Sequence, residues 1–215
     1  MTNSSVSRKP GYAVLTGFRC RYRVLIGLDV EAVSMSQQIA PDEAFDFELP
    51  NVGVGPDPLS LSVVIDASDF AVLLFLRDYH CPKCKAQVSE ISEHARQFNE
   101  MKTAVLPILP EPRAKADKWR EKVVSEFPFP LLADSEKTVA DQYDQPTRYG
   151  RVGQLSDLLG RLPQSVVLDT RGDDVEVIFE HEGDAIDDRP TPAELIDTVE
   201  DVQESFIFDC SLVEC

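Results

Sequence analysis

The sequence has few of the residues that mark several large classes of protein. Five cysteines in 215 residues are too few for a small secreted fold held together by disulfides. No apolar run approaches the roughly 18 residues of a membrane-spanning helix. Basic residues number 21 against 38 acidic ones, a net charge of −17, which argues against a nucleic-acid partner because phosphate binding needs a basic surface.

Lysine is especially scarce, with 8 lysines against 13 arginines. An acidic, lysine-poor surface is the composition expected of proteins from cells that accumulate salt, because high ionic strength screens the repulsion between like charges. The composition therefore favours a halophilic source. This hypothesis concerns habitat and leaves function open.

The charge is unevenly distributed along the chain. Residues 1–34 carry a net charge of +3 and show no clear helix or strand period, whereas residues 35–215 carry −20. We interpret 1–39 as a basic irregular extension, 40–207 as one domain and 208–215 as a tail. The extension is either a targeting or membrane-surface segment or an over-long reading frame whose true start is Met35. Without a convincing signal peptide, we expect a cytoplasmic protein that contacts no membrane.

A pair of cysteines stands between a predicted strand and a predicted helix. The apolar run Ala71–Phe75 is typical of a strand buried on both faces. Cys81-Pro82-Lys83-Cys84 follows it. One apolar stripe then predicts a helix that ends near Glu100. Its members are Cys84, Val88, Ile91, Ala95 and Phe98.

The remaining elements follow in the order of a thioredoxin fold. A strand is predicted over Thr103–Leu109, and a helix begins at Pro112 with its apolar stripe reaching Phe127. A short helix, two strands around the turn 169–173 and a last helix after the capping box at Thr191 complete the order. The fold class is therefore α/β, with a central mixed β-sheet flanked by helices on both faces.

The position of the pair predicts its chemistry. The first turn of a helix has unpaired amides and a positive dipole, both of which stabilise a thiolate at Cys81. Lys83 adds a minor electrostatic contribution. Cys84 heads the apolar stripe, so we expect Cys81 to be the exposed nucleophile and Cys84 the more buried resolving thiol.

Two other interpretations of the pair stay open. It could form half of a zinc site, completed by Cys210 and Cys215 or by histidines. The three histidines of the chain are His80, His94 and His181. Alternatively, the two cysteines are incidental core residues. A redox role is favoured because the strand–CxxC–helix context is the specific one. Cys210 and Cys215 could also act as additional resolving thiols or be bystanders.

Three segments resemble the AhpC/TSA-type redoxin (peroxiredoxin-like) family. They are Asp46–Asn51 with Leu59–Leu61, Phe129–Asp134, and Arg161–Asp169. The resemblance covers about residues 40–205. It implies a thioredoxin fold and thiol chemistry that needs no metal or organic cofactor.

The peroxidase signature of that family is incomplete here. Aligned on Cys81, Asp78 stands in place of Thr or Ser, Leu74 in place of Pro, and Pro163 in place of the late-strand Arg, with Arg161 two positions away. A Pro before the late strand is instead similar to the disulfide exchangers of the thioredoxin superfamily. By that resemblance, Pro163 is expected to be cis, to face the cysteines and to leave backbone groups free for a substrate strand.

The sequence therefore predicts a thiol-disulfide oxidoreductase that acts through Cys81 and Cys84. Its expected partners are a thioredoxin-type electron donor and a protein disulfide. The first alternative is a thiol peroxidase in which Cys81 attacks a peroxide. The second is a zinc-binding or structural module.

Overall fold

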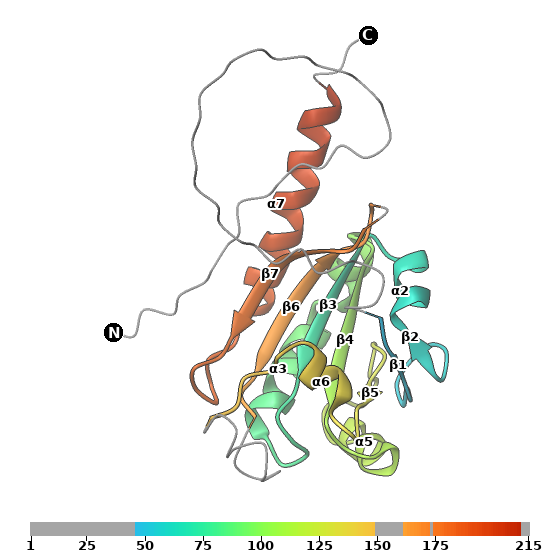
Figure 1. Ribbon diagram of the computed structural model, residues 1–215, viewed down its shortest axis with the longest axis vertical. Helices are drawn as coiled ribbons and strands as arrows, with labels where there is room; N and C mark the ends of the chain where they lie inside the picture. The colour runs from blue at the N-terminus through green and yellow to red at the C-terminus, as the bar shows by residue number, and fades with distance from the viewer. Residues whose placement is uncertain (1–45, 149–160, 173, 212–215) are drawn as a thin grey trace, which may run out of the picture.

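A computed structural model of the chain describes residues 46–148, 161–172 and 174–211, with side chains up to Glu204. Its centre is a mixed five-stranded sheet in the order β5-β4-β3-β6-β7 (Figure 1). β3, β4 and β5 are parallel, and β6 and β7 are antiparallel to their neighbours. The strands are β3 (Phe70–Phe75), β4 (Thr103–Leu109), β5 (Leu132–Ala133), β6 (Gln164–Asp169) and β7 (Glu176–Glu182). The predicted mixed sheet is confirmed.

Helices cover both faces of this sheet, as predicted. One hydrophobic cluster contains residues of α3 (Pro82–Glu93), α4 (Ala95–Glu100), α5 (Arg113–Arg120) and α7 (Pro192–Ser211). The cluster on the other face contains residues of β1 (Glu48–Leu49), β2 (Leu59–Ser60), α2 (Leu61–Ala67) and α6 (Thr138–Gln142). β1 and β2 pair with each other as a separate two-stranded sheet.

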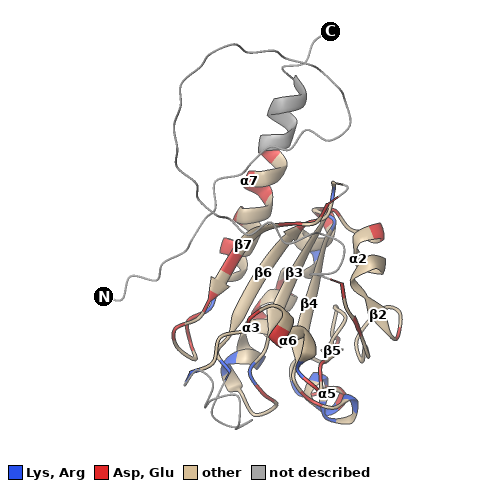
Figure 2. Cartoon of the chain, viewed as in Figure 1, with Lys and Arg blue, Asp and Glu red and all other residues tan. Residues whose placement is uncertain are grey.

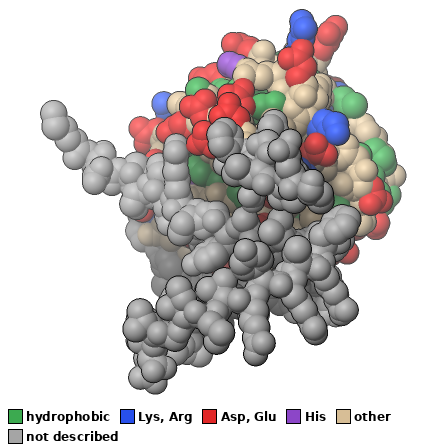
Figure 3. All heavy atoms as spheres, turned by 90° about the horizontal axis from the view of Figure 1, so that it is seen from above, with side chains coloured by type: hydrophobic (Ala, Val, Ile, Leu, Met, Phe, Trp, Pro, Cys, Tyr) green, Lys and Arg blue, Asp and Glu red, His purple; other side chains and the backbone are tan. Residues whose placement is uncertain are grey.

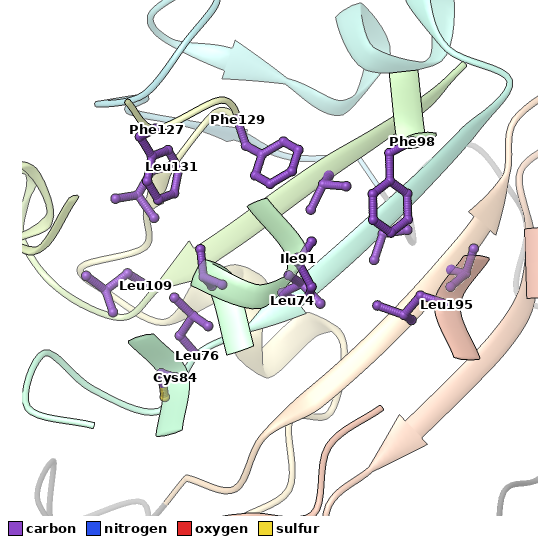
Figure 4. Packing of buried hydrophobic residues seen from close by; sticks show 14 of the residues in the cluster. Leu74, Leu76, Cys84, Ile91, Phe98, Leu109, Phe127, Phe129, Leu131 and Leu195 are labelled. Carbon is purple, nitrogen blue, oxygen red and sulfur yellow. The ribbon is translucent and has the colours of Figure 1, made fainter. Parts of the chain in front are cut away.

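β3 belongs to both cores because its side chains alternate between the two faces. Phe70, Val72 and Leu74 pack into the α3 side, whereas Ala71, Leu73 and Phe75 pack into the α6 side. All six residues are buried, so the uninterrupted apolar run in the sequence correctly marks the central strand. Figure 4 shows Leu74 and Leu76 beside Ile91 and Leu109 in the first cluster.

Two helices are shorter than the apolar stripes suggest. The predicted helix to Glu100 is interrupted at His94, whose φ of −102° and ψ of 10° leave the helical region. α5 ends at Arg120, although Val123 and Phe127 beyond it still pack into the same cluster. The stripes correctly identify buried positions, but burial does not require a continuous helix.

The predicted start of the last helix at Thr191 is confirmed, whereas the short helix α6 begins at Thr138, after Lys137, whose side chain does not cap it. The Asp134 carboxylate accepts the Ala140 amide at 3.0 Å, ahead of the middle of α6. Thr191 Oγ1 accepts the Glu194 amide at 3.3 Å, while the Thr191 amide donates to the Glu194 carboxylate at 2.8 Å. This reciprocal pair is the predicted capping box.

Across the three described ranges, no helix is both long and apolar enough to cross a membrane. The basic extension 1–39 and the end of the tail lie outside the described residues. The domain boundaries drawn from the sequence therefore stay a prediction.

Candidate active site

The two cysteines of the motif are joined in a disulfide at the beginning of α3. Cys81 is the residue before the helix, and its Sγ accepts the Cys84 amide at 3.1 Å. The two Cα atoms are 5.3 Å apart. Cys84 lies at one end of the hydrophobic cluster, near Leu76 (Figure 4). The parallel strand and the helix that starts after it thus bring both sulfurs to the positive end of the α3 dipole.

The predicted difference in exposure between the two cysteines is small. Cys84 is fully buried, as expected, but Cys81 is only 3% exposed. The expectation of an exposed Cys81 is therefore wrong for the disulfide form. Cys81 belongs to the same hydrophobic cluster as Cys84, and a side chain from a distant loop lies against both sulfurs.

That side chain is Arg189, in the loop before α7. Its Nη2 lies 3.3 Å from Cys84 Sγ and 3.6 Å from Cys81 Sγ. Its Nη1 donates to Gln87 Oε1 at 2.6 Å, and its Nε donates to the Ile186 carbonyl at 3.1 Å. The guanidinium is therefore held between α3 and its own loop while it faces the disulfide.

Burial, and then the nearby Arg77, lower the pKa of Arg189 to about 10. Arg189 nevertheless remains a cation at neutral pH, because pH 7 lies well below this value. A cation at 3.3–3.6 Å from the sulfurs stabilises a thiolate formed there.

The loop that carries Arg189 is anchored to the sheet. The Gly183 amide donates to the Pro163 carbonyl at 2.9 Å. Asp188 Oδ1 lies 3.2 Å from His181 Nε2, and Asp188 Oδ2 accepts the Asp184 amide at 2.9 Å. A Cβ at Gly183 would lie 2.6 Å from the Asp188 carbonyl oxygen, so the loop passes this point too closely for any side chain.

The segment between β3 and Cys81 supplies further contacts. The Arg77 amide donates to Cys84 Sγ at 3.4 Å, and Arg77 Nε donates to the Arg161 carbonyl at 2.7 Å. Asp78 Oδ1 accepts the His80 amide at 2.7 Å. The carboxylate that replaces the Thr or Ser of the peroxidase signature thus holds the turn that leads into Cys81.

Pro163 does not have the predicted form. Within the part of the chain that the structure describes, the cis peptide bond is Asp57–Pro58, and the bond before Pro163 is trans. The backbone around it is also occupied. Leu162 N donates to the Pro146 carbonyl at 2.8 Å, the Leu162 carbonyl accepts Gln145 Nε2 at 2.8 Å, and the Pro163 carbonyl accepts the Gly183 amide. The expectation of free backbone groups for a substrate strand is therefore wrong.

The other predicted site residues lie around the disulfide without a contact to it. Lys83 is exposed on the first turn of α3. The Arg161 guanidinium binds Asp141 at 2.6 Å and Gln145 at 3.3 Å, so this side chain is committed to α6 and its following loop.

Two residues of the site, Arg189 and Gln87, were not predicted from the sequence. Gln87 is three residues after Cys84 on the buried face of α3, and it is 6% exposed. A polar residue in an apolar stripe calls for a polar partner, and this was an available signal. Arg189 is the only basic residue within 182–190, a segment rich in acidic residues. No pattern in the nearby sequence connects it to the cysteines.

The zinc alternative finds no ligand set in the described residues. No group of three or more His, Cys, Asp or Glu side chains within them is placed to hold a metal ion. His94 Nδ1 contacts the Glu90 carbonyl, and His181 faces Asp188. The Cys210 side chain and Cys215 lie outside the described residues.

A disulfide at the start of a helix, directly after the central strand of a mixed sheet, defines a thioredoxin-fold dithiol protein. The profile of the AhpC/TSA family matches residues 40–173, and the chain belongs to this family. A thiol-based redox function follows from that membership.

Relatives agree with this assignment. The chain is 32% identical over 114 residues to Rv1608c of Mycobacterium tuberculosis, a protein named provisionally as a peroxiredoxin, which covers 53% of this chain and 70% of that relative. The crystal structure of peroxidoxin BcpB from M. tuberculosis is similar with a TM-score of 0.56 and 28% identity, over 73% of this chain and 93% of that one. Enterococcus faecalis AhpC shares the fold, with a TM-score of 0.62 and 16% identity over 80% of this chain and 95% of that one.

Proposed function

We propose that the protein is a dithiol oxidoreductase that cycles between a Cys81/Cys84 dithiol and the disulfide of the structure. The observation that carries this proposal is the disulfide itself, with Arg189 Nη2 within 3.6 Å of both sulfurs. Cys81 is the nucleophile, because its sulfur accepts an amide at the positive end of α3. Cys84 is the resolving thiol, because it is the fully buried partner.

The oxidation of the dithiol by a partner disulfide proceeds in two exchanges. The Cys81 thiolate attacks one partner sulfur, which forms a mixed disulfide and releases the other partner sulfur as a thiolate. The Cys84 thiolate then attacks Cys81 Sγ, forms the Cys81–Cys84 disulfide and releases the second partner thiolate. Two electrons pass to the partner, and the reverse sequence reduces this protein.

Arg189 supports both steps electrostatically. Its guanidinium faces both sulfurs, so it stabilises whichever of them carries the negative charge. The amides of Cys84 and Arg77 donate to Cys81 Sγ and Cys84 Sγ respectively. Lys83 adds a solvent-exposed charge on the same turn, where it makes a smaller contribution because water screens it.

A peroxide is the second candidate oxidant, and three observations favour it. Cys81 is 3% exposed, and the backbone at Leu162 and Pro163 is already hydrogen-bonded, so a small molecule has easier access than a protein strand. Arg189 also supplies the cation that the late strand lacks. The Cys81 thiolate would attack the O–O bond, releasing water or an alcohol and leaving a sulfenic acid, and Cys84 would then displace water to form the same disulfide.

The electrons that restore the dithiol come, in this proposal, from a thioredoxin-type donor in a reducing compartment such as the cytoplasm. Such a donor must reach a disulfide sulfur that is almost fully buried. We therefore infer that reduction includes an outward movement of Cys81 or of the loop that carries Arg189. No metal or organic cofactor enters the proposed chemistry.

The assignment of nucleophile and resolving thiol is tested with two variants, Cys81→Ser and Cys84→Ser. Both are made in a background with Cys20, Cys210 and Cys215 replaced by serine, so that only the pair remains. After oxidation with one equivalent of hydrogen peroxide or of a small disulfide, Cys84→Ser should be trapped as a dimedone adduct or a mixed disulfide in the mass spectrum. Cys81→Ser should react only at the rate of a free thiol. Equal trapping in both variants would refute the assignment.

The two oxidants are distinguished by rate constants. Stopped-flow oxidation of the reduced background protein by hydrogen peroxide is compared with oxidation by a protein disulfide. A peroxide rate constant at least about 100-fold above that of free cysteine would establish the peroxidase. A peroxide rate equal to that of free cysteine, together with fast exchange with the protein disulfide, would leave disulfide exchange as the activity.

A further inference from the structure

Basic residues are concentrated at the end of the molecule that carries the disulfide. Residues 77–85 and 111–122 together contain eight basic and four acidic side chains, a net charge of +4 in a chain of −17. Five of the eight lysines of the chain fall in these two segments. Figure 2 shows them around the start of α3 and along α5, whereas the charged residues drawn in α7, β7 and α2 are acidic.

Four of these lysines have no acidic partner among the residues that the structure describes. Lys83, Lys85, Lys118 and Lys122 make no ion pair with any residue of the described ranges, and we name them the lysine cluster. Other basic residues of the same segments are paired: Lys115 lies 3.0 Å from Glu111, and Arg120 lies 3.0 Å from Asp117. Unpaired lysines are notable in a chain with nearly twice as many acidic as basic residues.

Tyr79 links the two halves of the cluster. Lys122 Nζ donates to the Tyr79 hydroxyl at 2.6 Å and lies 4.8 Å from the centre of its ring. Lys85 Nζ lies 5.6 Å from the same ring centre. Because Tyr79 is two residues before Cys81, it brings cations from α3 and from the end of α5 to one surface beside the disulfide.

Gathering like charges in this way is unfavourable for the isolated chain, and an anionic partner or salt relieves the repulsion. The described acidic residues at the opposite end of the same molecule do not pair with these lysines. Seen from that end, acidic side chains predominate among the charged ones that are not hidden by undescribed residues (Figure 3). The cluster is thus a basic surface next to a redox-active disulfide on an otherwise acidic protein.

We propose that the lysine cluster is the docking surface for an acidic protein dithiol that reduces the Cys81–Cys84 disulfide. The proposal rests on the proposed function, because it names the class of electron donor for that disulfide. A carboxylate-rich protein fits better than a nucleic acid, because the remaining residues of the chain carry a net charge of −21 and repel an extended polyanion. Complementary charge at the edge of a contact mainly accelerates association and makes it dependent on salt.

The test compares the full-length oxidised chain with two charge-matched variants. Lys118→Gln/Lys122→Gln removes two charges from the cluster, and neither residue contacts the sulfurs. Arg96→Gln/Lys102→Gln removes two charges from α4 and its C-terminal end. The second-order rate constant for reduction by a thioredoxin of net negative charge is measured from 0.1 to 1 M KCl, with circular dichroism confirming that each protein is folded. Dithiothreitol, which is neutral, serves as the parallel reductant.

At 0.1 M KCl the cluster variant should react with thioredoxin about five- to tenfold more slowly than the unmodified chain and should lose most of the salt dependence. The α4 variant should behave like the unmodified chain, and all three should react equally with dithiothreitol. Equal thioredoxin rates for the two variants would overturn the docking proposal while leaving the dithiol function intact. An unmodified chain whose disulfide neither reductant opens would instead refute the proposed function.

Competition identifies the chemistry of the partner. Polyglutamate should slow reduction by thioredoxin at 0.1 M KCl without slowing reduction by dithiothreitol. Stronger competition by a single-stranded oligonucleotide of equal charge would overturn the proposal in favour of nucleic acid. Salt-sensitive dimerisation that the cluster variant abolishes, detected by sedimentation, would overturn it in favour of a second copy of the chain.

Discussion

Arg189 alters the electrostatics of a site whose sequence suggests a shortage of positive charge. The resemblance assigns a cation to the late strand, where this chain has Pro163, and Arg161 is occupied by Asp141. The guanidinium instead comes from the loop before α7 and reaches both sulfurs. A positive charge beside the sulfurs can come from different segments of a chain. The reactivity of the sulfurs depends on where the charge lies and not on which segment supplies it.

Replacing Arg189 should therefore raise the thiol pKa of the reduced protein. In Arg189→Gln the pKa of the more acidic cysteine should increase by about one unit, because a cation within roughly 4 Å favours the thiolate. The measurement is the thiolate absorbance at 240 nm, with the alkylation rate followed over the same pH range. Between pH 6 and 9 Arg189 keeps its charge, since its pKa is about 10, so the titration reports the sulfurs.

Arg171→Gln is the matched control, because it removes a guanidinium that binds Asp169 and lies over the Phe70 ring. It should leave the thiol pKa unchanged. A pKa that moves equally in both variants would indicate a general effect of net charge and would contradict a specific role for Arg189.

The pKa of the Glu182 carboxyl is raised by its surroundings, in contrast to the thiol pKa that we expect Arg189 to lower. Burial raises its pKa, and the nearby carboxylates of Glu180, Asp144 and Asp184 raise it further. Because folding favours the protonated form, ionised Glu182 destabilises the folded state above its raised pKa. Below the ordinary value of 4.5 the group is protonated in both states and this penalty disappears.

Glu182→Gln should thus raise the melting temperature at pH 7 and have little effect near pH 3.5. Thermal unfolding followed by circular dichroism at both pH values gives the comparison, with Glu200→Gln on the exposed side of α7 as the control. A gain that is equal at both pH values would point to a cause other than the ionisation of Glu182.

At the scale of elements, Gly183 lies where the loop that carries Arg189 packs closely against Pro163, just before β6 of the sheet. In Gly183→Ala the new Cβ would lie 2.6 Å from the Asp188 carbonyl oxygen and 2.7 Å from Pro163 Cγ. The loop must shift to relieve this contact, at a cost of about 1–3 kcal/mol in the free energy of unfolding. Urea unfolding measures the cost.

The same variant tests whether the loop positions Arg189. A shifted loop should raise the thiol pKa in Gly183→Ala in the same direction as in Arg189→Gln, and the two changes should not add in the double variant. Gly172→Ala is the control, because the Cβ there would meet the Asp174 carbonyl at 3.3 Å in the turn between β6 and β7. Additive pKa changes would show that the loop affects the thiol pKa independently of the Arg189 guanidinium.

The elements themselves show why some local predictions succeed. The apolar run of β3 and the capping box at Thr191 depend on residues within a few positions of one another, and both are found as predicted. The break at His94 and the end of α5 at Arg120 are not visible in the apolar stripes, because buried positions keep the helical spacing while the backbone leaves the helix.

At the scale of the whole molecule, the charge of −17 should make stability depend on salt. The melting temperature should rise between 0.05 and 2 M KCl, because the screening length falls from above about 10 Å to below about 3 Å. Thermal unfolding in KCl and in sucrose of equal osmolality separates screening from exclusion. A melting temperature that does not change with KCl would contradict the halophilic hypothesis.

The rate of reduction by an acidic thioredoxin should show the opposite trend and fall as the salt concentration rises.

The sequence by itself determined the order of β3, α3, β4, α5, α6, β6, β7 and α7, the position of Cys81 at the start of a helix, and the buried central strand. It did not indicate β1, β2, α2 or β5. The features that it did determine follow from contacts within a few residues, where the spacing of side chains fixes which face they share. Only the tertiary structure decided that Arg189, 105 residues from Cys84 in the chain, faces the disulfide. It also decided that Cys81 is buried and that the backbone of Pro163 is occupied, because loop packing against the sheet depends on contacts that no local pattern records.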